Sequence, residues 1–234
     1  MFLNKVSCFL DVKGLIITSK GIEETASLEI RELLNADCKI EEGCVIFELN
    51  NLEELCLLCY KCQSADRVLY LIGSFEFENF FEDFERFIEK VEFSDWVGKC
   101  KKPKIESIRV GTHNFNSVDI ETKVAGPILK KFKNKKVDIN NYGIVFLIYV
   151  VNNKCYFGVD FAGFELNKRD YKIFLHPNSL RGTIAYALVK ESGFEKEDIM
   201  LDPFSRDGVI AIEAAFYAAD FPHNYYKKDK YCSL

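Results

Sequence analysis

The regular alternation of β-type and helix-type segments is the feature that most restricts how this chain folds. Short runs rich in apolar and β-branched residues predict strands at residues 15–18, 44–49 and 67–72. Apolar residues at helical spacing predict helices at residues 22–34, 52–62 and 80–91. Gly21 is expected in a turn, and Asn50 and Asn51 as caps of the second helix. This order predicts a small ferredoxin-like sandwich with its helices on one face of the sheet.

A second group of segments follows a predicted linker at residues 95–104, which holds the single tryptophan and Pro103. A strand is expected at residues 105–110 and a helix at 117–132. A hairpin of strands 144–151 and 154–161 should turn at Asn152 and Asn153. The last part of the chain predicts a helix at 180–192, a short strand at 199–202 and a helix at 209–219.

Composition describes an ordinary folded protein. Of the 234 residues, 48% are hydrophobic and 29% charged, which is enough apolar material for one large domain or two small ones. The first thirty residues have no leader pattern, and their apolar runs are too short to cross a bilayer. The nine cysteines have no framework spacing and are interpreted as reduced thiols. We therefore expect a cytoplasmic protein with no membrane association.

Charge is unevenly distributed along the sequence. Residues 1–98 carry 9 Lys and Arg against 20 Asp and Glu, a net charge of −11. Residues 99–174 carry 15 against 7, a net charge of +8, and residues 175–234 carry 7 against 9, a net charge of −2. A polyanion would be attracted to the middle region.

Several stretches of the middle and late regions resemble a known domain arrangement. Ile108-Arg-Val-Gly-Thr-His113, Val124-Ala-Gly-Pro127, Val137-Asp-Ile139 and Tyr156-Phe-Gly-Val-Asp-Phe-Ala-Gly163 resemble a THUMP domain. Leu166-Asn-Lys-Arg-Asp-Tyr171 and Leu180-Arg-Gly-Thr-Ile-Ala-Tyr-Ala-Leu188 resemble the junction to the methyltransferase domain of THUMP-containing RNA methyltransferases. Gly21-Ile-Glu-Glu-Thr is similar to the ferredoxin-like domain that precedes THUMP in those proteins. The resemblance covers nearly the whole chain.

The segment Asp202-Pro-Phe-Ser-Arg-Asp-Gly-Val-Ile-Ala-Ile-Glu-Ala-Ala215 resembles the first methyltransferase motif of the same family, written D-P-F-C-G-S-G-T-x-x-x-E-A-A. The resemblance implies transfer of a methyl group from S-adenosylmethionine to structured RNA, most often to the exocyclic amine of a tRNA guanine. In a doubly wound fold this turn would hold the cofactor at the carboxyl edge of the sheet. The cofactor-binding residues it implies are Asp202, Pro203, Phe204, Ser205, Gly208 and Val209.

Two departures from the family pattern bear on activity. Arg206 and Asp207 stand where the family has glycine and serine, so the Arg206 side chain either blocks the cofactor or turns outward toward RNA. The family's Asn/Asp-Pro-Pro-Tyr/Phe catalytic motif has no counterpart in the 234 residues, so no catalytic residue is assigned. The sequence is therefore expected to hold an incomplete methyltransferase segment. Three explanations stay open: a second chain completes the segment, the segment is adapted to pack on the THUMP region, or the chain is an interrupted version of a longer protein.

Candidate RNA-binding residues lie in the basic middle region. Phosphates would attract its lysines, since backbone charge supplies most non-specific affinity for RNA. Arg109, His113, Asn114 and Phe115 follow a strand and are suited to recognising an RNA end by stacking and base-edge hydrogen bonds. The lysine and arginine candidates are Lys99, Lys101, Lys102, Lys104, Lys123, Lys130, Lys131, Lys133, Lys135, Lys136, Lys168 and Arg169.

Two other patterns favour packing over function. Cys56, Cys59 and Cys62 have the spacing of metal ligands, but a helical setting turns Cys62 away from the other two, so structural thiols are favoured and no metal is assigned. The aromatic run that includes Phe80, Phe84 and Phe87 has helical spacing and is interpreted as core.

The sequence thus predicts a ferredoxin-like unit at residues 1–98, a THUMP domain at 99–168 and the start of a Rossmann-like methyltransferase domain at 169–234. Its expected function is tRNA or structured-RNA binding, with methyl transfer where the catalytic motif is supplied elsewhere. The alternatives are a noncatalytic tRNA-binding module and a structural subunit of a split methyltransferase.

Overall fold

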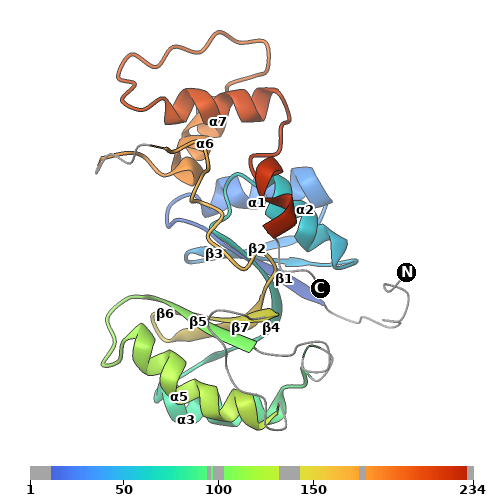
Figure 1. Ribbon diagram of the computed structural model, residues 1–234, viewed down its shortest axis with the longest axis vertical. Coiled ribbons are helices and arrows are strands. Elements are labelled where there is room, and N and C mark those ends of the chain that lie inside the picture. The colour runs from blue at the N-terminus through green and yellow to red at the C-terminus, as the bar shows by residue number, and fades with distance from the viewer. Residues whose placement is uncertain (1–11, 94–95, 97–102, 132–142, 174–177, 231–234) are drawn as a thin grey trace.

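A single seven-stranded sheet forms the centre of the computed structural model, which describes residues 12–93, 96, 103–131, 143–173 and 178–230 (Figure 1). The strand order is β2-β3-β1-β4-β7-β6-β5. The amino-terminal elements are β1 (Lys13–Ile17), α1 (Glu23–Leu34), β2 (Cys38–Glu41), β3 (Cys44–Glu48), α2 (Glu53–Lys61), β4 (Arg67–Glu76) and α3 (Phe80–Lys90). The later elements are β5 (Pro103–Val110), α5 (Ser117–Lys130), β6 (Ile144–Val151), β7 (Lys154–Asp160), α6 (Gly182–Glu191), α7 (Val209–Ala218) and the 3-10 helix η1 (Tyr225–Lys230).

Strand β4 joins the two halves of the sheet. Its first five residues, Arg67–Leu71, pair with β1, and the part from Leu69 to Glu76 pairs with β7 in antiparallel register, with an irregularity between Leu71 and Gly73. Strands β5 and β6 form a parallel pair, and the other paired strands are antiparallel. The sheet therefore crosses from the predicted ferredoxin-like unit into the predicted THUMP domain. The domain boundaries at 98/99 and 168/169, and the ferredoxin-like assignment, stay predictions.

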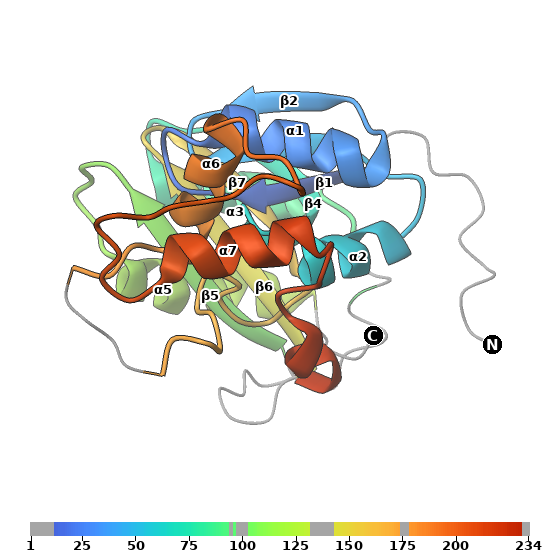
Figure 2. The same cartoon turned by 90° about the horizontal axis from the view of Figure 1, so that it is seen from above.

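Helices cover the sheet in two groups. Figures 1 and 2 show α1 and α2 over the amino-terminal strands, and α3 beside α5 at the other end of the molecule. Helices α6 and α7 pack on each other, and α6 also contacts α1, so the late part of the chain is stacked on the amino-terminal helices (Figure 2).

Burial follows the apolar pattern of the sequence. All eight residues of β6 are buried, as expected of a continuous apolar run in a central strand. In α3, Phe80, Phe84 and Ile88 lie four residues apart and are buried, whereas Glu82, Glu85 and Arg86 stay outside. Each buried large side chain contributes about 1.5–3 kcal/mol of hydrophobic stabilisation.

The expected aromatic core is confirmed. Phe80 and Phe84 are 2% and 1% exposed, and Phe87 packs against the same core cluster, where its ring stacks on Phe75. Cys59 and Cys62 are also buried in that cluster, whereas Cys56 is exposed, so the three thiols do not face one another as ligands would. Among the described residues, no group of three or more His, Cys, Asp and Glu side chains could hold a metal ion.

Two sequence expectations about elements were wrong. Residues 199–202 form no strand, and Ile199 and Leu201 are 99% and 83% exposed, because the described residues include no neighbouring strand for them to pair with. Conversely, β2 was missed, since Cys38–Glu41 is a four-residue strand at the sheet edge whose Lys39 and Ile40 are exposed, so it has no apolar run. Asn51 was correctly expected near the start of α2, where its side-chain oxygen accepts a hydrogen bond from the Glu54 amide at 3.1 Å.

Candidate functional site

A hollow of about 980 Å³ opens beside the β6–β7 turn, between the starts of α3 and α5. We call it the hairpin hollow. The residues that line it are Phe77, Glu78, Asn79, Phe80, Phe81, Thr112, His113, Asn114, Phe115, Asp119, Lys123, Asn152 and Asn153. Aromatic rings and amide side chains predominate in this set, which suits contact with flat, polar groups.

His113 is held in a hydrogen-bonded chain at the edge of the hairpin hollow. The guanidinium of Arg109 donates to His113 Nδ1 at 3.1 Å and to the Gly111 carbonyl at 2.9 Å. Because Nδ1 accepts that bond, Nε2 carries the proton and donates to the Asn152 carbonyl at 2.5 Å. The imidazole also stacks on the Phe115 ring, with centroids 5.0 Å apart. The structure thus brings Arg109 and His113 together, and one face of His113 is already occupied by Phe115.

Lys123 is the basic candidate that lies at the hairpin hollow. Its ammonium group sits over the Phe81 ring, 4.3 Å from the centroid, so α5 presents a cation beside an aromatic face. Asp119, which also lines the hollow, is engaged in a capping box with Asn116 at the start of α5. Asn114, another predicted contact, lines the hollow as well.

The other lysine candidates are scattered. Lys130 pairs with Glu85 of α3 at 3.2 Å, and Lys131 donates to the carbonyls of Glu89 and Val91 at 3.4 and 3.3 Å. These contacts join α5 to α3, so both lysines have local partners. Lys133 and the further candidates Lys99, Lys101, Lys102, Lys135 and Lys136 lie outside the described residues.

The two candidate RNA-binding residues in the segment 166–171, Lys168 and Arg169, differ in exposure. The Lys168 side chain is 78% exposed and forms an ion pair with Glu165. Arg169, in contrast, is buried against Glu213 of α7 at 2.8 Å, and its side chain has no exposed surface. The predicted RNA contact by Arg169 is therefore corrected, because a guanidinium enclosed by protein groups cannot reach a phosphate.

The cofactor-binding candidates form an exposed turn that leads into α7. Asp202 organises it, since its carboxylate accepts a hydrogen bond from the Phe204 amide at 3.2 Å and its carbonyl accepts one from the Ser205 amide at 3.3 Å. Pro203, Ser205 and Arg206 are exposed, and Phe204 is 93% exposed.

Gly208 ends this turn and caps α7. Its φ of 71° lies in the left-handed region that glycine adopts without strain, and a side chain there would meet open space apart from Ile212. The following residue, Val209, is buried and anchors the helix. The first amides of a helix have no partner within it, and at α7 the Asp207 carboxylate already bonds the Val209 amide, so the remaining N–H groups of the first turn are the available donors.

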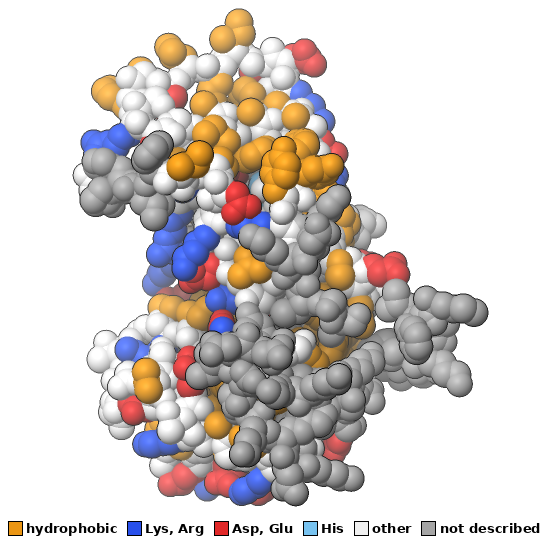
Figure 3. All heavy atoms as spheres, viewed as in Figure 1, with side chains coloured by type: hydrophobic (Ala, Val, Ile, Leu, Met, Phe, Trp, Pro, Cys, Tyr) orange, Lys and Arg blue, Asp and Glu red, His pale blue; other side chains and the backbone are white. Residues whose placement is uncertain are grey.

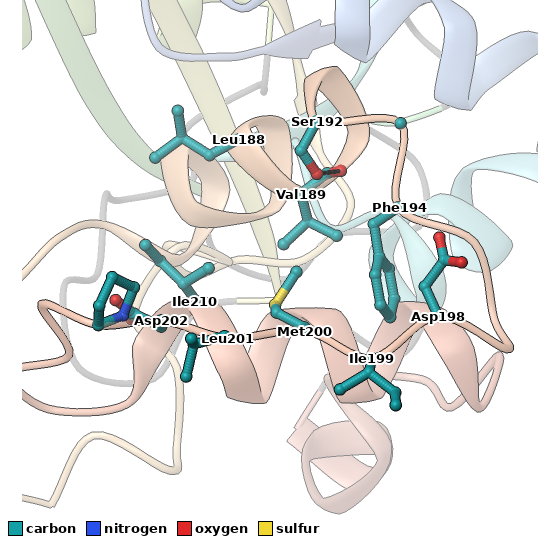
Figure 4. Close-up of a pocket in the computed structure, with 12 residues that line it drawn as sticks. Leu188, Val189, Ser192, Phe194, Asp198, Ile199, Met200, Leu201, Asp202 and Ile210 are labelled. Carbon is teal, nitrogen blue, oxygen red and sulfur yellow. Dashed lines mark hydrogen bonds between the residues drawn. The ribbon is translucent and has the colours of Figure 1, made fainter.

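A second hollow of about 460 Å³ lies beside the turn, between the end of α6 and residues 198–203 (Figure 4). Met200 points toward Val189 of α6, whereas Ile199 points away from it (Figure 4). Figure 3 shows apolar side chains gathered over this end of the molecule, where Ile199, Leu201 and Phe204 are exposed. Asp202 and Pro203 line the same hollow, so two of the six predicted cofactor residues border it.

Sequence reasoning missed several residues of these sites. Phe77 and Asn152 both line the hairpin hollow. Asn152 was recognised as part of a turn, and its φ of 51° is a conformation that asparagine tolerates well. Outside the two hollows, the hydrogen bonds of Gln63 and Tyr171 to Glu213 were not predicted, because they join residues 150 and 42 positions apart in the chain.

Comparison with known proteins identifies two domains in succession. Residues 78–160 match the model of the THUMP domain, and residues 169–233 match the RMKL-like methyltransferase domain. The tRNA (guanine(6)-N2)-methyltransferase of Methanocaldococcus jannaschii is 26% identical over 225 residues, which are 92% of this chain and 59% of that protein. The chain thus spans about three fifths of the length of this relative.

Solved structures share the fold. A predicted N6-adenine-specific DNA methylase from Listeria monocytogenes superposes with a TM-score of 0.78 at 19% identity, covering 95% of this chain and 58% of that one. The putative methyltransferase SMU.472, complexed with SAH, gives a TM-score of 0.69 at 22% identity, covering 89% and 56%. In the described part of this chain, no helix is long and apolar enough to span a membrane.

Proposed function

The chain carries a THUMP domain followed by an RMKL-like methyltransferase domain, and from this pairing we propose that it binds tRNA, or another structured RNA, for S-adenosylmethionine-dependent methylation. The observation that carries the proposal is the succession of the two domains, with all lining residues of the hairpin hollow except Phe77 inside residues 78–160 and the exposed turn inside 169–233. The exocyclic amine of a guanine is the proposed target, in keeping with the name of the archaeal relative.

The hairpin hollow is the proposed RNA contact. Unpaired bases are held by stacking on aromatic or histidine rings and by hydrogen bonds to their edges, which the rings and amides of the hollow provide. Arg109 fixes the His113 ring, and Lys123 supplies positive charge for a phosphate next to the stacked base. Asn114 and Asn152 add amide groups for base edges.

The turn at residues 202–208 is the proposed cofactor contact. The backbone fits, because Gly208 leaves open space and α7 begins directly after it, with the Val209 amide bonded by Asp207 and the next amides without a partner inside the helix. Bound S-adenosylmethionine would supply the methyl group, and Asp202 would orient the turn that holds it. Arg206 is exposed, in keeping with the outward alternative for its side chain.

A noncatalytic RNA-binding module is the second candidate. The observation that favours it is the substitution in the turn, where Arg206 and Asp207 replace the small residues that the family pattern has there. Asp207 adds a carboxylate whose pKa is lowered by a hydrogen bond with Ser179 and by nearby Lys172, so it stays charged beside the turn.

The binding of bulk tRNA to the full chain tests the RNA proposal. Its affinity is measured by fluorescence anisotropy at salt concentrations from about 50 to about 200 mM. We expect affinity to fall steeply with salt. His113→Ala should weaken binding roughly 10-fold through lost stacking, and Lys123→Gln should lower the salt slope by about 1. Lys39→Gln, on the opposite edge strand β2, is the matched control and should leave both quantities unchanged. Equal effects of Lys39→Gln and Lys123→Gln would rule out the hairpin hollow.

Titration calorimetry with S-adenosylhomocysteine separates the two candidate functions. Heat of binding that is lost in Gly208→Val would support the cofactor turn, because a branched side chain is strained at a φ of 71°. Salt-dependent tRNA binding without any cofactor heat would favour the noncatalytic module. If the chain binds neither tRNA nor S-adenosylhomocysteine, both candidate functions are refuted.

A further inference from the structure

The carboxylate of Glu213 is the centre of a buried hydrogen-bond network in the seam between the late helices and the amino-terminal unit. It accepts hydrogen bonds from Tyr171 Oη at 2.6 Å, Gln63 Nε2 at 2.7 Å, and Arg169 Nε and Nη2 at 2.8 and 3.3 Å. The side chains of Glu213 and Arg169 have no exposed surface. One carboxylate of α7 thus gathers four donors.

These donors come from separate parts of the chain. Gln63 lies between α2 and β4, and Arg169 and Tyr171 lie in the junction that precedes α6. Gln63 also donates to the backbone carbonyl of Glu213 at 3.2 Å, and Arg169 donates back to the Gln63 carbonyl at 2.5 Å. The network therefore joins α7 to the amino-terminal unit by side-chain and main-chain contacts at once.

Directional contacts of this kind fix orientation more tightly than apolar packing does. A buried charge requires a full set of well-aligned partners, and small displacements leave it unsatisfied. Burial and the nearby carboxylate of Glu213 raise the pKa of Tyr171, so its hydroxyl keeps the proton that it donates. The packing next to the pair is equally tight, since a Cβ on Gly182 would lie 2.6 Å from both Arg169 Nε and Glu213 Oε1.

Two ion pairs that also cross the seam are solvated. Lys190 pairs with Glu32 of α1 at 2.8 Å, but the Glu32 side chain is 54% exposed. Lys61 pairs with Asp220 at 3.0 Å, and the Asp220 side chain is 68% exposed. Exposed pairs of this type constrain position weakly, because water replaces either partner at little cost.

We propose that Glu213 is a positioning residue: its carboxylate sets the orientation of α7, and with it the turn capped by Gly208, relative to the amino-terminal unit and, through strand β4 of the shared sheet, relative to the hairpin hollow. Glu213 lies five residues after Gly208, the N-cap of the same helix. The positioning role of Glu213 does not depend on the proposed function. The further idea that this fixed orientation presents an RNA nucleotide to a cofactor rests on the proposed function.

The distance between two spin labels on the full chain tests the proposal. One label replaces Val118 on α5, which is 69% exposed, and the other replaces Ala215 on α7, which is also exposed. Because the chain has nine cysteines, both labels are attached to a genetically encoded keto amino acid. We expect a narrow distance distribution in the parent protein and a distribution at least twofold wider in Glu213→Gln, whose amide cannot accept all four donors.

Glu32→Gln is the matched control, since it removes the charge of a solvated carboxylate in the same seam, and its distribution should stay narrow. A folded Glu213→Gln protein with the parent distribution would overturn the proposal, because a residue that contributes stability alone changes the folded fraction and not the distance within it. If Glu213→Gln does not fold, Tyr171→Phe, which removes one donor and keeps the ion pair, should widen the distribution to a smaller degree; an unchanged width would overturn the proposal.

Binding measurements on the same variants separate this proposal from the proposed function. Glu213→Gln should bind tRNA within twofold of the parent, because the hairpin hollow is untouched. If the parent binds neither tRNA nor S-adenosylhomocysteine, the proposed function fails while the label distances still decide the role of Glu213.

Discussion

At the scale of single residues, close packing around one buried ion pair explains a glycine that sequence patterns alone do not. Gly182 opens α6 with ordinary backbone angles, so a positive φ is not the reason for it. The space of a side chain at this position is taken by Arg169 and Glu213. Close packing, and not backbone conformation, thus accounts for glycine at position 182.

Gly182→Ala should lower the free energy of unfolding by roughly 3 kcal/mol, since the new methyl group forces apart a buried pair whose disruption costs about 3–5 kcal/mol. Gly126→Ala in α5 is the matched control, because nothing lies within 4 Å of the added Cβ, and it should change stability by less than about 1 kcal/mol. Urea unfolding followed by circular dichroism measures both. Equal effects of the two substitutions would contradict the packing argument.

At the scale of elements, the segment that follows α7 turns back and docks on the amino-terminal unit. Asn224 donates to the Cys59 carbonyl at 2.9 Å, and Lys227 donates to the Lys168 carbonyl at 2.7 Å and pairs with Asp170 at 2.9 Å. His223 is buried in this segment, within hydrogen-bond distance of the Asn224 amide. Burial, together with the positive charges of Arg169 and Lys227, holds the pKa of His223 well below its usual value.

This depressed pKa makes the docking of the segment sensitive to acid. The unfolded chain protonates His223 near pH 6.5 and the folded chain does so at lower pH, so the stability contributed by neutral His223 is present above about pH 6.5 and is lost as pH falls. Below that pH, the free energy of unfolding should fall with decreasing pH more steeply in the parent than in His223→Gln. The difference between the two slopes should be up to about 1.4 kcal/mol per pH unit. Urea unfolding between about pH 7.5 and 5.5 measures the difference, and identical slopes would contradict the assignment.

At the scale of the whole molecule, one sheet passes through both halves of the chain. Strands β6 and β7 lie in its interior and are almost entirely buried, whereas β2 forms an edge. Strand β4 connects the amino-terminal strands to β7, and the Glu213 network ties the late helices to the same unit. We therefore expect the interior of the sheet to open through global unfolding.

Hydrogen exchange measured by mass spectrometry tests this expectation. Peptides from β6 and β7 should exchange most slowly, at a rate that tracks the global free energy of unfolding, and peptides from β2 and from residues 199–205 should exchange many-fold faster. Faster exchange of β6 than of β2 would show that the two halves open independently.

The succession of elements and the family resemblance were determined by the sequence. Hydrophobic periodicity placed helices α1, α3 and α7 within a few residues, because a buried helical face imposes its spacing on local residues. The Asn152–Asn153 turn was likewise predictable, since a hairpin depends on neighbouring residues. The motif residues that implied a THUMP domain and a methyltransferase domain are also local strings, and the family models match in the same regions.

Tertiary structure alone decided which charged groups face solvent and which are enclosed. Arg169 was indistinguishable in sequence from exposed Lys168, yet it is buried beside Glu213. Residues 199–202 have strand-like composition but no pairing partner among the described residues, and a strand needs a neighbour to satisfy its backbone. Both outcomes depend on contacts between residues far apart in the chain, and local patterns carry no information about such contacts.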